Sequence, residues 1–495
     1  VALPAPHGCG TLPTMPLTRR ELLGGAATGP FIRTARAAAA RRPNFLFLLT
    51  DDQSYATLSI TGSPFMKTPN IDRLGREGVV FSNCFVAMSL CAPSRACNLT
   101  GLYPHSNGIY NNGIRWNQEL QSLPRLLHDA GYRTAHIGKF HMDGDDRVQP
   151  GYDYWAAQIA QGAYVDPRKN INGKWVDLKG YDTQIITDQA IEFMRGAKPG
   201  QPFCAWMGYK ACHGPFTPAP GHENDFAGIE FKPPSSYFID DEGKPARVRG
   251  RARGGDQPAG KAGRKKAKAA AQPLGLEQWA ARERDQHRCL MGVEDSVARL
   301  LRFLDEQKLA EDTIIVYAGD NGFFHGEHGL HGKMEAYEEA LRVPMLARYP
   351  RAIQPGQRSS AFVSNVDLLP TILDFCGLKA PRPVQGRSWR PQVDGRARSQ
   401  PSREAFLYEM FGGGADPAHP TVKALRTSRY KLILNLHPRD IDELYDLQND
   451  PREMKNLARE KGQRELIAQL TRQMLALMRE LEDPAIPAVE ATLKG

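Results

Sequence analysis

The chain has 495 residues, 41% of them hydrophobic, and carries a formal net charge of +9 at pH 7. This size and composition suffice for a large buried core, and no apolar run approaches the roughly 20 residues of a membrane-spanning helix. The positive charge is concentrated in two short segments, because residues 244–268 hold ten Lys or Arg against one Asp, and residues 1–42 hold six Arg against one Glu. The rest of the chain is mildly acidic, which argues against a nucleic-acid-binding surface.

The N-terminal residues 1–42 predict an export leader. Paired Arg19 and Arg20 precede a mildly apolar stretch and a small-residue cleavage site near Ala37. This order is typical of Tat signals, so we expect an exported, periplasmic protein. An amphipathic N-terminal helix is the alternative, which Pro30 and the glycines of the stretch disfavour.

Residues 43–380 predict one large catalytic α/β unit. Residues 44–50 and 313–319 are short continuous apolar runs, which predict strands buried on both faces of a parallel sheet. Strands that alternate with helices indicate a doubly wound sheet, in which ligands bind beyond the carboxyl ends of the strands. The predicted helices of this unit cover residues 70–77, 120–130, 181–194 and 279–307. Residues 243–272 interrupt the pattern, since they are rich in Gly, Ala, Arg and Lys without apolar periodicity, and they predict a basic inserted loop.

Residues 381–495 predict a smaller C-terminal α+β subdomain. The boundary falls near residues 378–403, which are dense in Pro, Arg and Ser. Beyond it, four short runs predict an antiparallel sheet, at residues 405–408, 422–427, 430–435 and 443–447. An amphipathic helix over residues 463–481 would cover one face of this sheet.

Polar side chains follow both buried strands of the large unit. Asp51 and Asp52 end the first apolar run, and Asp320 and Asn321 end the second. One such pair alone would more often cap a helix or close a loop. Two pairs at the ends of two buried strands favour a shared site.

Cys91 opens the segment C-A-P-S-R-A-C-N-L-T-G. Pro93 suits the first turn of a helix, so Cys91 should lie just before a helix N-terminus, where the helix dipole favours negative charge. A buried structural cysteine or an ordinary thiolate of lowered pKa would be the alternatives for Cys91 alone. The whole string, however, resembles the type I sulfatase signature, C-x-P-S-R followed by L-T-G, of the alkaline-phosphatase-like superfamily. No position of the core pattern departs from it.

This resemblance implies a fold, a modification and a metal ion. The fold is a large mixed, mostly parallel sheet flanked by helices, with a smaller C-terminal antiparallel sheet and a helix. A formylglycine-generating maturation enzyme would oxidise Cys91. The implied metal ligands are Asp51, Asp52, Asp320, Asn321 and the modified Cys91. Such an all-oxygen shell suits Ca²⁺, with Mg²⁺ as the alternative.

The resemblance also implies the catalytic groups. A sulfate monoester is a weakly electrophilic anion, so the metal, Arg95, Lys139 and Lys333 would gather positive charge around its oxygens. One hydroxyl of the hydrated aldehyde would attack sulfur, and His141 would deprotonate the other as sulfate leaves. His213, helped by Lys333, would protonate the leaving oxygen. Lys139 and His141 would share one face if their segment is extended. With Cys91, these five residues complete the predicted catalytic set.

The substrate implied by the resemblance is a sulfated carbohydrate, with a faint similarity to N-acetylglucosamine-6-sulfatases. Three alternatives stay open. A phosphatase of the superfamily would use Ser or Thr with two zinc ions, whereas D-N-G at residues 320–322 favours one cation. A formylglycine-dependent phosphodiester or phosphonate hydrolase has nearly the same motif. A non-catalytic sulfated-glycan-binding protein is the third alternative.

Two further patterns are weaker. His325, His328 and His331 recur every three residues, but the intervening glycines describe a loop and the H-E-x-x-H order of a zinc site is missing. His331 is better interpreted as a pocket residue near the substrate. Eight scattered cysteines contain no C-x-x-C pair, and a disulfide between Cys84 and Cys97 stays open.

Overall fold

The computed structural model describes residues 42–144, 146–237, 243–246, 248, 275–396, 402–412 and 420–493. The predicted leader lies outside these residues except for Arg42, and so does most of the predicted inserted loop 243–272. Within the described part, no helix has both the length and the apolar character needed to cross a bilayer.

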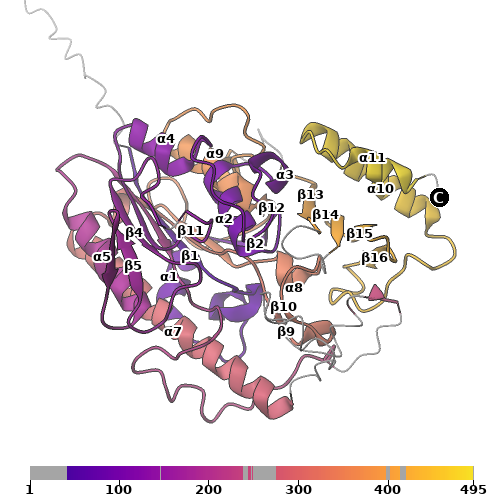
Figure 1. Cartoon of the computed structure of the whole chain (residues 1–495), viewed down its shortest axis with the longest axis horizontal. Helices are drawn as coiled ribbons and strands as arrows, with labels where there is room; N and C mark the ends of the chain where they lie inside the picture. The colour runs from indigo at the N-terminus through magenta and orange to yellow at the C-terminus, as the bar shows by residue number, and fades with distance from the viewer. Residues whose placement is uncertain are drawn as a thin grey trace, which may run out of the picture. The chain divides into compact units, whose positions relative to one another are not determined.

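A ten-stranded mixed sheet is the centre of the larger part of the chain (Figure 1). In spatial order its strands are β12 (Gln357–Ser364), β2 (Val79–Phe85), β11 (Met345–Arg348), β8 (Thr313–Gly319), β1 (Asn44–Thr50), β7 (Phe203–Gly208), β3 (Arg133–Lys139), β4 (Tyr154–Gln158), β5 (Arg168–Ile171) and β6 (Lys174–Asp177). The central run from β8 to β4 is parallel throughout, whereas β11, β5 and β6 pair antiparallel with their neighbours. The predicted mixed, mostly parallel sheet is therefore confirmed.

The packing of strand β1 explains why apolar and polar residues do not alternate along it. Phe45, Phe47 and Leu49 enter a core on one face of the sheet, and Leu46 and Leu48 enter a core on the other. The first core is covered by α2 (Cys91–Thr100), α4 (Leu123–Asp129) and α9 (Leu368–Phe375). The second is covered by α1 (Pro69–Arg76), α5 (Asp182–Arg195) and α7 (Leu276–Glu306). Burial on both faces favours apolar side chains at each of these five positions, and the polar Asn44 and Thr50 stand only at the ends of the strand.

The four predicted helices form, but the one predicted over residues 120–130 is shorter. Helix α4 starts only at Leu123, and Pro124 occupies its first turn. A proline is favoured at that position because its missing N–H would have no helical partner there. The residues before it form turns instead, with Asn117 accepting a hydrogen bond from Glu119 N at 3.0 Å.

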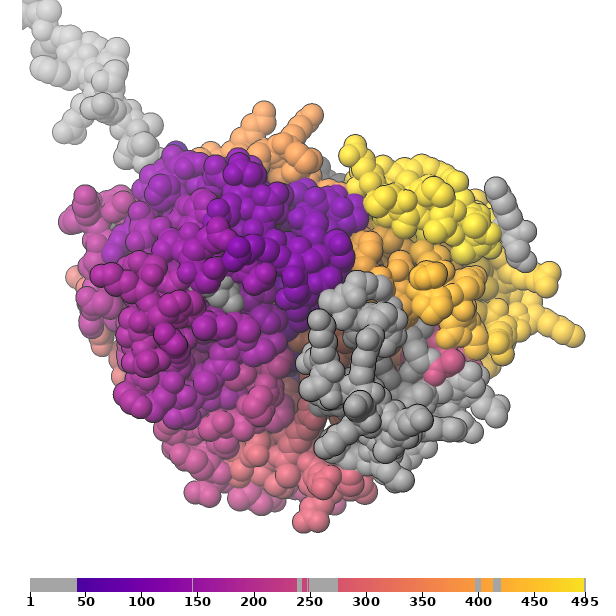
Figure 2. Space-filling model, viewed as in Figure 1, coloured from indigo at the N-terminus to yellow at the C-terminus, as the bar shows by residue number. Residues whose placement is uncertain are grey.

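The C-terminal part has the predicted small sheet and helix. Strands β13 (Ala405–Met410), β14 (Thr421–Thr427), β15 (Tyr430–His437) and β16 (Glu443–Asp446) pair antiparallel in chain order. Helix α10 (Arg464–Glu480) packs Leu470 and Met474 onto Leu425 and Leu432 of this sheet, and α11 (Ile486–Ala491) follows it. In the space-filling view violet residues of the larger part adjoin the orange and yellow C-terminal part (Figure 2).

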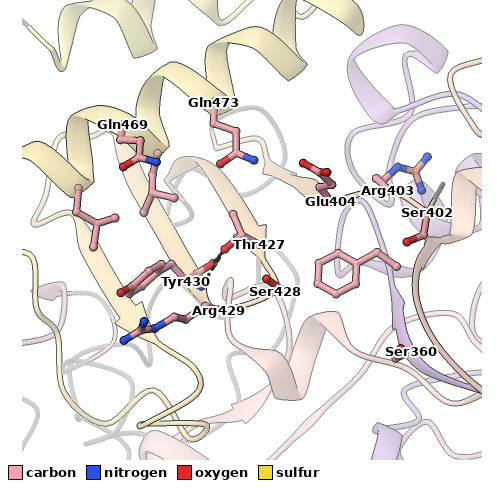
Figure 3. Close-up of a pocket in the computed structure, with 13 residues that line it drawn as sticks. Ser360, Ser402, Arg403, Glu404, Thr427, Ser428, Arg429, Tyr430, Gln469 and Gln473 are labelled. Carbon is pink, nitrogen blue, oxygen red and sulfur yellow. Dashed lines mark hydrogen bonds between the residues drawn. The ribbon is translucent and has the colours of Figure 1, made fainter.

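A cleft of about 610 Å³ opens between α10 and the strands beside it (Figure 3). Gln469 and Gln473 line it from the helix, and Thr427 and Tyr430 line it from the sheet. None of the predicted catalytic or metal-binding residues reaches this cleft.

The cysteines of the described part are free and buried. Cys84 faces Met345, with the two sulfur atoms 3.4 Å apart, whereas Cys97 lies beside Asn107. The disulfide left open between Cys84 and Cys97 is therefore wrong, because the two side chains enter different clusters of the core.

Candidate active site

The two acidic segments meet because β1 and β8 are parallel neighbours in register. Thr50 pairs with Gly319, so Asp51 and Asp320 are the next residues at the same edge of the sheet. Asp320 N donates to Thr50 O at 2.9 Å, and Asp52 N donates to Asp320 Oδ1 at 3.1 Å. The structure thus places both predicted polar pairs at the carboxyl ends of adjacent central strands.

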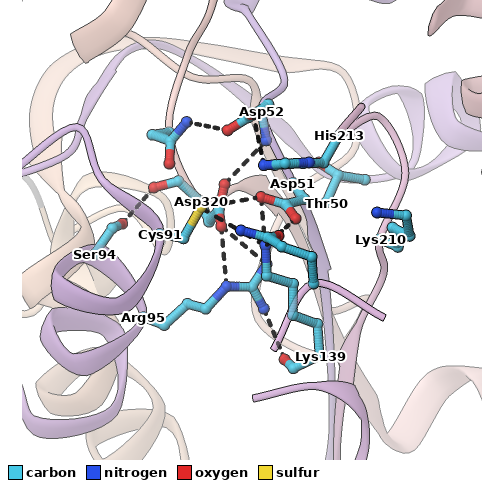
Figure 4. A network of polar contacts seen from close by, with 12 residues as sticks. Thr50, Asp51, Asp52, Cys91, Ser94, Arg95, Lys139, Lys210, His213 and Asp320 are labelled. Carbon is cyan, nitrogen blue, oxygen red and sulfur yellow. Dashed lines mark hydrogen bonds and ion pairs between the residues drawn. The ribbon is translucent and has the colours of Figure 1, made fainter. Parts of the chain in front are cut away.

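Cys91 faces these carboxylates from the start of α2 (Figure 4). Cys91 is itself the first residue of the helix, with Leu90 as the N-cap, so the helix begins one residue earlier than predicted. Its sulfur lies 3.4 Å from Asp51 Oδ1 and 2.8 Å from Lys333 Nζ, and its side chain is fully buried. The side chain at position 91 therefore lies between a carboxylate and an ammonium group.

Two lysines from distant segments approach the same point. Lys139 ends β3, and its Nζ contacts the Asp51 carboxylate and lies 3.7 Å from Cys91 Sγ. Lys333 follows the short strand β10 (His331–Gly332), and its Nζ contacts the Asp52 carboxylate. The predicted cationic groups are thus gathered around position 91.

Arg95 connects three elements beneath the site. It lies one turn after Cys91 on α2, and its Nε donates to Asp320 Oδ2 at 2.9 Å. Its Nη1 donates to Lys139 O at 2.8 Å. Because a guanidinium stays charged and offers donors in a fixed plane, Arg95 holds α2, β8 and β3 in one arrangement.

The two predicted histidines reach the cluster differently. His213 Nε2 lies 3.6 Å from Asp52 Oδ2, and His213 Nδ1 lies 2.5 Å from Gly214 O. Since a carbonyl only accepts, Nδ1 carries a proton and Nε2 is free to exchange one. His141 does not continue an extended segment, because β3 ends at Lys139 and His141 has a left-handed φ of 63°. It still lies close enough to Lys139 and Asp51 to interact with their charges.

Burial and neighbouring charges shift the titration of these groups. Burial, with the nearby Asp51 charge, raises the pKa of Asp320 to about 6. Burial opposes ionisation of Asp51 too, but Lys139 and His213 hold the pKa of Asp51 well below its usual range. Burial lowers the pKa of His213. Burial and the charge of Lys139 lower the pKa of His141 well below its usual value. Both imidazoles are therefore neutral at pH 7.

The thiol encoded at position 91 is a poor nucleophile. Burial and the Asp51 charge raise the pKa of Cys91 to about 12, although Lys139 and Lys333 oppose the shift. At neutral pH the group is therefore a protonated thiol rather than a reactive thiolate.

The polar groups of the site fit a hard divalent cation. Asn321 Nδ2 donates to Asp52 Oδ1 at 2.7 Å, whereas the buried Asn321 Oδ1 accepts no hydrogen bond from any described residue. Ligand atoms of Asp51, Asp52, Cys91 and His213 lie within 4.8 Å of one another. Carboxylate oxygens gathered in a buried site suit Ca²⁺ or Mg²⁺, and Asn321 beside Asp52 offers an amide oxygen that accepts no hydrogen bond from the described residues.

The three regularly spaced histidines face separate partners. His325 Nδ1 lies 2.7 Å from Glu283 Oε2, and His325 Nε2 lies 3.1 Å from Ser54 Oγ. His328 packs on Tyr337 with ring centroids 4.6 Å apart, and His331 lies 6.0 Å from the ring of Tyr237. Among the described residues, the groups that could hold a metal include none of these histidines.

Several supporting contacts carry no recognisable signal in the sequence. Gln161 Oε1 accepts a hydrogen bond from Lys139 Nζ, and Ser94 Oγ donates to Asp320 O. Ser94 belongs to the recognised motif, but its role appears only in the structure. Gln161 carries no sequence signal, since it follows β4 in a loop of ordinary composition. The Glu283–His325–Ser54 chain was also missed, and it ties α7 to the segment that follows Asp52.

Comparisons with known proteins agree with this geometry. A sequence model of the sulfatase family matches residues 43–378, and one described as the C-terminal part of N-sulphoglucosamine sulphohydrolase matches residues 326–480. An N-acetylglucosamine-6-O-sulfatase of Bacteroides thetaiotaomicron is 34% identical over 467 residues, covering 84% of this chain and 83% of the relative. The human N-acetylglucosamine-6-sulfatase is 31% identical over 417 residues, covering 79% of this chain and 71% of the relative.

A solved structure in complex with its substrate D-glucosamine-2-N,6-O-disulfate superimposes with a TM-score of 0.82 and 32% identity, covering 90% of this chain and 99% of that chain. Fold and site thus define an alkaline-phosphatase-like hydrolase. Within that superfamily the chain belongs to the sulfatase family, and it is a hydrolase of sulfate esters.

Proposed function

We propose that the protein removes sulfate from a sulfated saccharide, with Cys91 oxidised to formylglycine as its nucleophile. The observation that carries this proposal is the position of Cys91 Sγ, 3.4 Å from Asp51 and 2.8 Å from Lys333 at the centre of the buried polar cluster. The relatives named for N-acetylglucosamine 6-sulfate, and the similar structure bound to a glucosamine disulfate, support a 6-sulfated glucosamine of a glycosaminoglycan as the substrate.

The roles of the side chains follow from their charges and positions. Lys139, Lys333 and Arg95 would stabilise the charge that develops on the sulfate oxygens. His141, neutral and buried, would accept a proton from position 91 as sulfate is released. His213 would protonate the leaving oxygen through Nε2, since an anionic substrate beside it would favour its protonated form.

The proposed modification and cation would supply the remaining chemistry. A hydrated aldehyde at position 91 would provide the attacking hydroxyl, and a divalent cation would withdraw charge from the sulfate. Asp51, Asp52, Asp320 and Asn321 would hold that cation, which we propose is Ca²⁺, with Mg²⁺ as the alternative.

The burial of Cys91 constrains when it can be oxidised. The side chain is 0% exposed, so a maturation enzyme could reach it only in the unfolded chain. We further propose export through the Tat pathway, on the basis of the twin-arginine leader. Because that pathway carries folded cargo, oxidation would precede export. Expression without a formylglycine-generating enzyme should then give a folded protein with an intact thiol and no sulfatase activity.

A screen of defined sulfated mono- and disaccharides, combined with mass spectrometry of the Cys91 peptide, tests the proposal. We expect release of sulfate from 6-sulfated glucosamines and a peptide mass in which an aldehyde replaces the thiol. Activity that does not depend on this conversion would contradict the mechanism. Glycan binding without any turnover by the converted protein would instead favour a binding protein.

A formylglycine-dependent phosphonate or phosphodiester hydrolase is the second candidate. A phosphonate monoester hydrolase of Agrobacterium radiobacter superimposes with a TM-score of 0.70 at 19% identity, covering 89% of this chain and 96% of that chain, which shows a shared fold. A phosphodiester and a phosphonate monoester should therefore be assayed beside the sulfated sugars. A higher kcat/KM for either phosphorus substrate would favour this candidate.

A further inference from the structure

Residues 108–116 border the candidate active site on two sides. They follow the short helix α3 (Pro104–Asn107) and form the first part of its connection to α4. Asn112 Oδ1 accepts a hydrogen bond from Ala92 N at 3.0 Å, and Trp116 N donates to Met142 O at 2.8 Å. Ala92 and Met142 are the chain neighbours of Cys91 and His141. The segment therefore runs along the rim of the site, from the nucleophile position to the proposed base.

This rim carries an exposed aromatic side chain. Tyr110 lies two residues before Asn112 and is 43% exposed, whereas most large apolar side chains of the described part are buried. Its ring centroid lies 5.8 Å from that of Phe411, with the two planes inclined at 53°. Phe411 follows β13, so the C-terminal part of the chain contributes half of this aromatic pair.

A buried polar cluster links the two segments that carry these rings. Glu409, two residues before Phe411, accepts from His105 N at 2.9 Å and lies 2.8 Å from His105 Nδ1. Lys423 Nζ lies 2.7 Å from Glu409, 2.5 Å from Asp483 and 5.1 Å from the Phe411 ring centroid. Charges of opposite sign satisfy one another inside this cluster. It therefore holds α3 against the end of β13, close in sequence to both Tyr110 and Phe411, and this restricts how far the two rings can separate.

We propose that Tyr110 and Phe411 form an aromatic platform for the sugar ring that bears the scissile sulfate. This inference rests on the proposed function, because it names the contact that recognises the alcohol part of that substrate. The cationic cluster around Cys91 can bind the sulfate of any ester, so recognition of the sugar needs contacts outside it. A pyranose ring has an apolar face of C–H groups, and an aromatic ring at the rim of a polar pocket binds such a face.

The test compares the wild type with Tyr110→Ala, Tyr110→Phe and Phe411→Leu, each matured to formylglycine. The substrate is the sulfated monosaccharide that the wild type turns over fastest, and inorganic sulfate is the competitive inhibitor. We expect Tyr110→Ala to raise KM about tenfold, with kcat and the inhibition constant of sulfate nearly unchanged. Tyr110→Phe keeps the ring and should behave as the wild type, whereas Phe411→Leu should raise KM by a smaller factor.

Leu493→Ala is the matched control, since it also removes an exposed apolar side chain, 41% exposed, from the C-terminal end of the chain. An unchanged KM in Tyr110→Ala would overturn the platform. An equal loss of sulfate affinity would also overturn it, because the cationic pocket itself would then have been distorted. Absence of turnover by the matured wild type on every sulfated sugar would instead contradict the proposed function.

Discussion

Two buried clusters of acids, lysines and histidines differ in how their charges are satisfied. In the cluster behind the C-terminal sheet, burial opposes ionisation, yet Lys423 and His105 lower the pKa of Glu409 to about 2, and Glu409 raises the pKa of His105. At the ends of β1 and β8, burial and Asp51 raise the pKa of Asp320 to about 6. The first cluster stabilises charged partners, whereas the second shifts the pKa values of two neighbouring carboxyl groups in opposite directions, that of Asp51 down and that of Asp320 up.

This difference is what we expect between a structural cluster and the proposed catalytic one. Both contain acids and a histidine close enough to suggest a metal site. The C-terminal cluster is sealed, with Lys423 and Glu409 fully buried and paired. In the other cluster, the side chain of His213 remains 21% exposed, and Asn321 Oδ1 accepts no hydrogen bond from the described residues. Perturbed and incompletely satisfied groups at the rim of a sheet are typical of catalytic sites.

The largest expected effect is on activity, at Cys91. Replacing Cys91 with Ala should lower kcat/KM by a factor of about 10³ or more, because the nucleophile is lost. The denaturation midpoint should change little. Cys84→Ala is the matched control, since Cys84 is equally buried but lies in the hydrophobic core. Full activity in Cys91→Ala would refute the proposed nucleophile.

The largest expected effect on stability is at Lys423. Lys423→Met would leave Glu409 and Asp483 buried without their cationic partner. We expect the free energy of unfolding, measured in urea, to fall by about 3–5 kcal/mol. Lys179→Met, which removes the exposed ion pair with Asp166, should change it little. Equal stabilities of these two variants would show that the C-terminal cluster is not structural.

The next largest expected effect is that of cation binding, which should involve only the cluster at the ends of β1 and β8. If Ca²⁺ binds the folded protein alone, a concentration of about 100 times its Kd should raise the free energy of unfolding by about 2.7 kcal/mol. Chelation should abolish both this increase and the activity. Asp320→Asn removes one proposed ligand and should lose most of the response, whereas Glu409→Gln should keep it. If the increase in stability depends on Glu409 instead, the cation-binding site lies in the C-terminal cluster.

The smallest expected effect is a pH dependence at His105. Because Glu409 raises the pKa of His105 in the folded state, protonation of His105 stabilises the fold below its unfolded pKa. This contribution is lost as the pH rises through the raised, folded-state pKa. Urea denaturation at a series of pH values should therefore show a stability decrease above about pH 6.5 that His105→Gln reduces. His128→Gln, at a half-exposed position, should retain the decrease.

Much of the candidate active site could be located from the sequence because its signals are local. The unbroken apolar run of β1 identifies a strand buried on both faces, and the polar residues after it mark the ligand-binding edge. The string from Cys91 to Gly101 resembles a single known motif, and the structure brings its Arg95 to Asp320. Two predictions were wrong for local reasons. Pro124 delays the start of α4, which was predicted from residue 120, and the left-handed backbone of His141 ends the extended segment predicted for Lys139 and His141.

Other features could not be predicted because they depend on contacts between distant segments. No periodicity pairs His105 with Glu409, or Tyr110 with Phe411, and the spacing of Cys84 and Cys97 does not reveal that they enter different core clusters.

The sequence by itself therefore determined the strand and helix types and identified the candidate nucleophile position and the candidate cation ligands. Only the tertiary structure decided that β8 lies beside β1, that Lys333 reaches Cys91, and that Phe411 of the C-terminal part lies beside Tyr110. The physical reason is that hydrophobic periodicity and short motifs act over a few residues, whereas packing of whole faces selects which distant side chains meet.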